Sequence, residues 1–175
     1  NTTKHTLVNC EETKEVVINI VNYAIVQQMS LSSTEYPDEV NEFEKSGLTM
    51  LNSDIVKPYR VKESPVQFEC KVKDIVNLGK DGGAGNLIIS EVIKMHISET
   101  VLDDSGKIDQ YKIDQVARMG GSWYSRANRG MFEVPKPLAK LGMGVDQIPM
   151  HIKNSTILTG NDLGKLGNVE AFPQD

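Results

Sequence analysis

Residues 66–97, VQFECKVKDIVNLGKDGGAGNLIISEVIKMHI, contain the pattern that decides the fold. Apolar and polar side chains alternate strictly at its start, where Val66, Phe68, Cys70 and Val72 alternate with Gln67, Glu69, Lys71 and Lys73. A period of two residues predicts an antiparallel β-strand with one buried face and one solvated face. Residues 79–86, GKDGGAGN, are expected to form a glycine-rich turn, and residues 86–97 to form the partner strand. We therefore predict one long antiparallel hairpin.

Shorter elements are expected on both sides of this hairpin. The N-terminal side predicts a helix over residues 3–12, a strand over 15–21, a helix over 22–31 and a helical turn over 40–45. The C-terminal side predicts a helix that buries Ile108, Tyr111, Ile113 and Val116 and ends at Gly120–Gly121, then a hairpin that turns at residues 128–130. Because βαβ alternation is missing, we expect a mainly β fold with peripheral helices, arranged as a compact antiparallel barrel.

Composition narrows the class of protein. The 175 residues are enough for one domain with a core, and the formal net charge of -5 does not favour nucleic acid or an anionic membrane as a partner. No apolar run approaches the length of a membrane span, and no charged-then-apolar leader is present. Cys10 and Cys70 show no CxxC spacing, so we expect two half-buried thiols in the reducing cytoplasm, and a single bridge between them is the alternative.

Most motifs that would indicate a particular chemistry are not found. The glycine-rich segment lacks the Gly-Lys-Ser/Thr ending of a P-loop, and no GxSxG elbow occurs. The three histidines, His5, His96 and His151, are not linked by HxxxH or HExxH spacing, so we predict no metal site. His96 is expected to be a strand-terminal residue, not a ligand. The acidic run at Asp103–Asp104 does not fit an EF-hand loop and is expected to form a solvated turn.

The first residues, NTTKHT (1–6), could bind an anion. Thr2, Thr3 and Thr6 offer hydroxyl donors and Lys4 offers a positive charge. They stand at the start of the first predicted helix, where unpaired backbone N–H groups and the helix dipole favour a phosphate. Threonine is also a common N-cap residue, so from the residues alone an ordinary helix cap is the better interpretation.

Four stretches, taken in order, resemble one family. They are TKHTLVNCEETKEVVINIV (3–21), SSTEYPDEVNEFEKSGLT (32–49), VKPYRVKESPVQFECKV (56–72), and NLIISEVIKMHI (86–97) followed by ARMGGSWYSR (117–126). Together they are similar to the flavin reductase-like family, of the flavoredoxin and nitrilotriacetate monooxygenase component B type. The resemblance implies a split β-barrel of the FMN-binding type over residues 1–137. Residues 138–175 are then a C-terminal extension, expected to wrap the barrel or a dimer partner.

The resemblance also implies a function and a set of contacts. Family members are homodimers that bind FMN and pass hydride from NADH or NADPH to flavin, often for a partner monooxygenase. Lys4 and Thr6 match the Lys-x-Thr positions that face the flavin phosphate, and the adjacent Thr2 and Thr3 could donate as well. With the resemblance, a phosphate site that also caps a helix becomes the better interpretation of the first residues. No acid or base is required, since hydride passes directly to flavin.

A second group of residues is implied near the dimer cleft. Tyr124 could stack on flavin or nicotinamide, although core packing of Trp123 and Tyr124 is an equally good interpretation. Arg118 and Arg126 are further candidates for a nicotinamide phosphate or flavin contact. The same residues would also suit a flavin-binding protein without turnover or a purely structural dimerisation domain.

The chain departs from the family pattern in two places. The family's first strands, with an Asn-x-Ala-Pro-x-Ser-like stretch that holds the flavin ring, have no match within residues 1–175. We expect an upstream segment to supply them, because the remaining strands would otherwise expose an open edge. The family's Asp between Lys and Thr is His5 here.

Overall fold

The computed structural model describes residues 4–79, 84–135 and 141–171. The chain divides into two compact units, Asn1–Gly130 and Met131–Asp175, and each is described by itself. The boundary predicted after residue 137 lies inside the second unit. The predicted residues Thr2 and Thr3, and most of the glycine-rich turn, lie outside the described residues.

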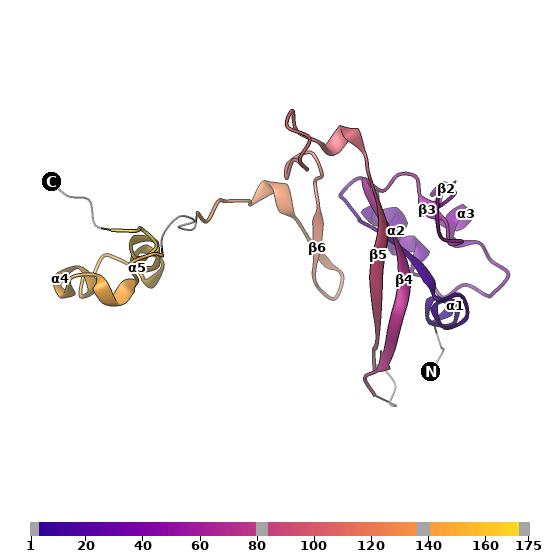
Figure 1. Cartoon of the computed structure of the whole chain (residues 1–175), viewed down its shortest axis with the longest axis horizontal. Coiled ribbons are helices and arrows are strands. Elements are labelled where there is room, and N and C mark those ends of the chain that lie inside the picture. The colour runs from indigo at the N-terminus through magenta and orange to yellow at the C-terminus, as the bar shows by residue number, and fades with distance from the viewer. Residues whose placement is uncertain (1–3, 80–83, 136–140, 172–175) are drawn as a thin grey trace. The chain divides into compact units, whose positions relative to one another are not determined.

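The long hairpin is the centre of the first unit (Figure 1). Strands β4 (Val66–Asn77) and β5 (Asn86–Ile97) pair antiparallel along their lengths, as predicted. Strand β1 (Glu15–Asn19) pairs antiparallel with the other side of β4, giving the order β1-β4-β5. The pairing of β4 with β5 shifts register after Glu69 and again after Val72, and such bulges bend the pair.

The outer strand of this described sheet carries much exposed apolar surface. β5 pairs only with β4, and its sequence is largely apolar. Five of its large hydrophobic side chains are exposed: Leu87, Ile89, Val92, Met95 and Ile97. The sheet is therefore open at β5 within the part of the chain that the structure describes.

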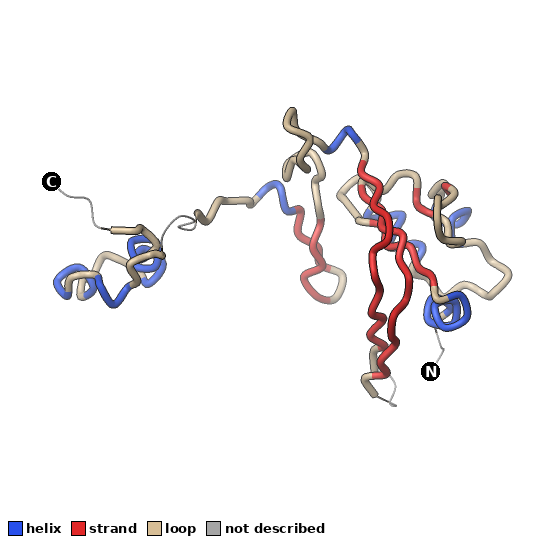
Figure 2. Tube along the Cα trace, in the orientation of Figure 1, coloured by secondary structure: helices blue, strands red, loops and turns tan. Residues whose placement is uncertain are grey.

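Three short helices flank the sheet (Figure 2). They are α1 (His5–Thr13), α2 (Val26–Ser32) and α3 (Glu42–Ser46). α1 ends where Lys14 takes a left-handed conformation, with φ of 57°. α3 begins where the Asn41 side chain accepts a hydrogen bond from the N–H of Phe43, and it ends at Gly47, with φ of 67°. All three predicted helical segments are confirmed, with α2 beginning four residues later than expected.

A small apolar core closes one end of the hairpin. Val66, Val101 and Ile113 are buried against one another, and Ile20, Phe68 and Ile108 pack around them. Val101 lies in the 3-10 helix η1 (Glu99–Val101), which follows β5 directly. The core therefore joins β4 to the segment that follows the hairpin.

The prediction of a helix that ends at Gly120–Gly121 is wrong. Residues 116–126 form a second hairpin, in which β6 (Val116–Gly120) pairs antiparallel with β7 (Trp123–Arg126). Gly120 and Gly121 both have positive φ, 102° and 51°; Gly120 ends β6 and Gly121 begins the hairpin turn, so neither glycine ends a helix. Of the predicted buried set, Ile113 is buried, whereas Tyr111 is 64% exposed. The turn expected at residues 128–130 is instead the short 3-10 helix η2 (Ala127–Arg129).

The second unit is helical where the sequence showed no clear period. It contains η3 (Val145–Gln147), α4 (Met150–Lys153) and α5 (Gly160–Gly167). α5 begins with a capping box, in which Thr159 and Asp162 each bond the other's backbone N–H. That this region wraps the barrel or a partner stays a prediction. Among the described residues, no helix has the length and apolar content needed to cross a membrane.

Candidate functional site

The start of α1 presents unpaired backbone donors. Lys4 is the N-cap residue, and no side chain there accepts a capping hydrogen bond. Its carbonyl accepts the first helical bond, from the N–H of Leu7 at 2.9 Å. The N–H groups that precede this bond, those of His5 and Thr6, have no carbonyl partner within a helix, and the helix dipole adds partial positive charge. This end of α1 is therefore suited to an anion.

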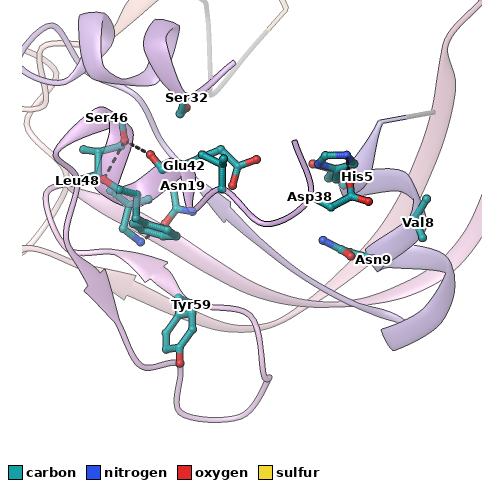
Figure 3. A pocket seen from close by; sticks show the side chains of 14 residues that line it. His5, Val8, Asn9, Asn19, Ser32, Asp38, Glu42, Ser46, Leu48 and Tyr59 are labelled. Carbon is teal, nitrogen blue, oxygen red and sulfur yellow. Dashed lines mark hydrogen bonds and ion pairs between the residues drawn. The ribbon is translucent and has the colours of Figure 1, made fainter. Parts of the chain in front are cut away.

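Two neighbouring cavities, here called the α1 cavities, open at this helix end. One has a volume of about 680 Å³ and the other about 750 Å³, and His5, Thr6, Ser32 and Glu42 line both. Figure 3 shows the first cavity, with His5 and Asn9 of α1 on one side and Ser46 of α3 on the other. The second cavity is lined by Lys4 and by hydroxyl residues of the loop after α2, namely Ser33, Thr34 and Tyr36. The predicted Lys4 and Thr6 thus lie together in one cavity.

Two acidic side chains contact Lys4 and His5 at this site. Lys4 Nζ lies 2.9 Å from Glu35 Oε1, and His5 Nε2 lies 2.7 Å from Asp38 Oδ1. The Lys4 and Glu35 side chains are 68% and 65% exposed. An exposed ion pair contributes at most about 1 kcal/mol. Lys4 can therefore exchange Glu35 for a more highly charged phosphate at little cost.

A buried carboxylate fixes the loop beside the first α1 cavity. Glu69 is fully buried on β4, where one solvated face was predicted, so that prediction is wrong at this position. Its Oε1 accepts from the N–H of Asp54 at 2.8 Å, and its Oε2 accepts from the N–H groups of Ile55 and Val56 at 2.7 and 3.1 Å. These bonds lower the pKa of Glu69 to about 2 although its burial acts to raise it. The loop leads to Tyr59, which lines the cavity (Figure 3).

The neighbouring Gln67 is buried as well, contrary to the same prediction. Its side chain donates to the carbonyl oxygens of Val61 and Ser64, and it accepts from Arg60 Nη1 at 3.2 Å. The segment before β4 therefore folds over this face of the strand and replaces water as its hydrogen-bonding partner. Strand alternation in the sequence carries no sign of such a cover.

One group of side chains has the composition of a metal site. Asp54, Glu69 and His96 bring one ligand atom each to within 4.8 Å of one another. However, Glu69 Oε1 already contacts both the Asp54 N–H and His96 Nε2, the latter at 2.6 Å, and Lys94 pairs with Asp54. The Glu69 carboxylate, which a cation would need as a ligand, is thus already hydrogen-bonded within the protein. The contacts of the group are those of a cluster of polar and charged side chains that bind one another.

The predicted Tyr124 lies in a different cavity. This cavity, here called the α2–hairpin cavity, lies between α2 and the β6–β7 hairpin and has a volume of about 640 Å³. It is lined by Tyr124, Arg118 and Arg126, which were all named as candidates from the sequence. Neither Lys4 nor Thr6 lines it, so the structure does not bring Tyr124 together with them. Trp123 is 78% exposed, which contradicts the alternative that it packs in the core.

The two cysteines are unsuited to nucleophilic chemistry. Both are free and buried, and burial raises the pKa of each thiol. A thiol held in its protonated form is a poor nucleophile and a poor metal ligand. The chemistry of this chain is therefore expected from a bound group and from polar side chains, not from thiolates.

Comparison with known proteins shows the family to which the chain belongs. Residues 1–112, which include α1, β1, β4 and β5, match the model of the flavin reductase like domain. The chain belongs to this family. Among the curated relatives of this flavin reductase-like chain is an uncharacterized protein of Aquifex aeolicus (strain VF5), 37% identical over 127 residues, which are 73% of this chain and 63% of the relative. Another, from Halalkalibacterium halodurans, is 32% identical and covers 71% of this chain and 60% of its own length.

Solved structures confirm the predicted fold class, a mainly β split barrel. Nitrilotriacetate monooxygenase component B from Bacillus cereus is 25% identical with a TM-score of 0.69, covering 75% of this chain and 65% of that protein. A Shewanella frigidimarina protein described as a flavin reductase with a split barrel domain is 28% identical with a TM-score of 0.66. The match covers 77% of this chain and 66% of that protein. The flavin reductase-like chain thus spans about three fifths of the length of the curated relatives that it matches.

Proposed function

We propose that this chain binds FMN and serves an oxidoreductase of the flavin reductase type, which passes hydride from NAD(P)H to flavin. The observation that carries the proposal is the uncapped start of α1, with Lys4 and Thr6 in one cavity, in a member of the flavin reductase-like family. The donor set fits a phosphate monoester, which is a dianion with three acceptor oxygens. A helix N-terminus and a lysine are a recurring combination for such a group.

Each residue at this helix has a distinct role in the proposal. The N–H groups of the first turn and the Thr6 hydroxyl donate to phosphate oxygens, and Lys4 supplies a charge that leaves Glu35 for the phosphate. Flavin, when bound, accepts hydride and carries the redox chemistry. The protein needs only to fix one end of the cofactor and shield it. A homodimer and a monooxygenase partner are also proposed, in line with the relative that is named as a monooxygenase component.

Flavin retention tests the proposal directly. Purified protein is mixed with FMN and desalted, and the absorbance of the bound flavin is measured at about 450 nm. We expect Lys4→Ala to lower retention about tenfold, the effect of losing one charge-assisted contact. Lys62→Ala is the matched control, because Lys62 is exposed and lines neither α1 cavity.

Two further measurements separate the rival functions. Steady-state oxidation of NADH and NADPH with free flavin distinguishes a reductase from a protein that only binds flavin. Glu35→Gln removes the acidic partner of Lys4 and is expected to increase retention. A protein that retains no FMN, or one in which Lys4→Ala and Lys62→Ala behave alike, would rule out this phosphate site.

A further inference from the structure

The α2–hairpin cavity has an unusual balance of charge for an acidic chain. The side chains that line it include two arginines and no carboxylate, while the chain as a whole has a net charge of -5. Arg126 is neutralised, because its guanidinium donates to both carboxylate oxygens of Asp114 at 2.6 to 3.1 Å. Arg118 has no carboxylate within ion-pair distance among the described residues. The cavity therefore keeps one uncompensated positive charge.

Hydrogen bonds hold the Arg118 side chain in place but occupy only some of its N–H donors. Its Nε and Nη2 donate to the carbonyl oxygen of Gly121, at 3.2 and 2.9 Å. This carbonyl belongs to the β6–β7 turn, where Gly121 takes a φ of 51°. A guanidinium has five N–H donors in a fixed plane, so three remain for a ligand. An arginine oriented in this way loses little side-chain entropy when an anion binds.

The rest of the lining suits a nucleotide. Ser30, Ser122 and Ser125 offer hydroxyl donors, whereas the hydroxyl of the fourth serine in the lining, Ser33, already donates to the Met29 carbonyl oxygen. The Tyr23 ring is 52% exposed, and Arg126 covers one of its faces at 4.0 Å from the ring centre. The opposite face of that ring can stack on a base, as aromatic side chains commonly do. The volume of about 640 Å³ lies within the range of small-molecule sites.

We propose that the α2–hairpin cavity binds the phosphorylated adenosine end of the nicotinamide dinucleotide co-substrate. Arg118 and the serines bind the phosphate, and Tyr23 stacks on the adenine base. The inference rests on the proposed function for the choice of dinucleotide, but the cavity shares only Ser33 with the α1 cavities and is lined by neither Lys4 nor Thr6. Free Arg118 favours a ligand with an added phosphate on the ribose, so we expect preference for NADPH over NADH.

A binding experiment tests the inference without turnover. The probe is 2′,5′-ADP, titrated by calorimetry into the same protein preparation that is used for the flavin test. We expect Arg118→Gln to weaken binding about tenfold to a hundredfold, because a charge-assisted bidentate contact is lost. Arg129→Gln is the matched control, since it makes the same charge change on the next segment, and Arg129 does not line the cavity. Arg118→Lys is expected to keep part of the affinity for 2′,5′-ADP that Arg118→Gln loses, because lysine has the positive charge but lacks the planar pair of donors.

The outcomes distinguish this inference from the proposed function. Weak binding by Arg118→Gln, with normal binding by Arg129→Gln and unchanged FMN retention, supports a separate dinucleotide site. Equal binding of 2′,5′-ADP by Arg118→Gln and Arg129→Gln would overturn the inference, whether or not FMN is retained. Binding of 2′,5′-ADP that depends on Arg118 in a protein that retains no FMN would support the site and reject the flavin proposal. Binding of inorganic phosphate as tightly as 2′,5′-ADP would reject the adenosine contact.

Discussion

Replacing Glu69 by Gln should destabilise the first unit, although the two side chains have nearly the same shape. The Glu69 carboxylate is buried and accepts hydrogen bonds from three consecutive backbone N–H groups, those of Asp54, Ile55 and Val56. An amide offers one oxygen where the carboxylate offers two. Whichever way the amide is turned, its NH₂ group faces at least one N–H donor.

The magnitude follows from these contacts. The favoured orientation turns the NH₂ group toward His96, whose Nε2 can accept in one of the ring's tautomers, and leaves the Asp54 N–H without an acceptor. One lost bond to a charged group costs about 1.5–3 kcal/mol, and the remaining bonds weaken with the loss of charge. The lowering of the Glu69 pKa from 4.5 to about 2 corresponds to about 3 kcal/mol of stabilisation at neutral pH. We therefore expect a loss of about 3 kcal/mol.

Urea unfolding followed by circular dichroism measures this loss. At pH 7 the variant should unfold at a clearly lower urea concentration, whereas the control Glu91→Gln, which removes an exposed ion pair with Lys73, should shift the free energy by less than about 1 kcal/mol. Because the folded pKa of Glu69 is lowered, its contribution is complete above pH 4.5 and is lost as the pH falls toward 2. The difference between the two proteins should narrow over that window. A Gln variant as stable as the wild type at pH 7 would refute the reasoning.

Three other perturbations test separate features of the first unit. Ile113→Ala should lower the free energy of unfolding by about 2–4 kcal/mol, because it empties part of the buried core, and urea unfolding measures it. Cys10 and Cys70 should react slowly with a disulfide reagent in the folded protein and quickly in urea, since both thiols are buried; fast native reaction of either would contradict their burial. Asp114→Asn, which keeps a residue that tolerates the φ of 50°, should cost about 1–2 kcal/mol at pH 7 through loss of the Arg126 pair. Arg126 lowers the pKa of Asp114, so this cost should begin to shrink as the pH falls below the ordinary value of 3.8 and should be lost only below the lowered pKa of the folded protein.

The elements that the sequence predicts well depend on local pattern. The β4–β5 hairpin follows from strict alternation and a glycine-rich turn, and both signals lie within one continuous stretch. Lys4 and Thr6, which the family resemblance implies as phosphate contacts at the first helix, do share a cavity in the structure. The second hairpin was missed because a pair of glycines can end a helix or form a turn. Pairing of Val116 with Arg126, ten residues away, decides between these alternatives.

The features that the sequence does not reveal depend on long-range contacts. Glu69 alternates with apolar neighbours and so resembles a solvated strand residue, but its partners come from residues 54–56. A β-bulge directly after Glu69 also breaks the regular alternation, and bulges have no clear sequence signal here. The α2–hairpin cavity likewise needs α2 to lie beside a hairpin that was not predicted. Arg118 and Arg126 were named as candidates before the structure, but the Tyr23 ring, one face of which Arg126 covers, was not.

The exposed face of β5 has a practical consequence for anyone who produces this polypeptide. A twelve-residue strand at the margin of a sheet offers a row of backbone donors and acceptors to any extended chain that approaches it. The five exposed apolar side chains of β5 favour association with such a chain. Only Glu91 and Lys94 carry a full charge on this strand. We therefore expect the fraction of monodisperse protein to fall as the protein concentration is raised, unless another polypeptide covers the β5 edge during expression.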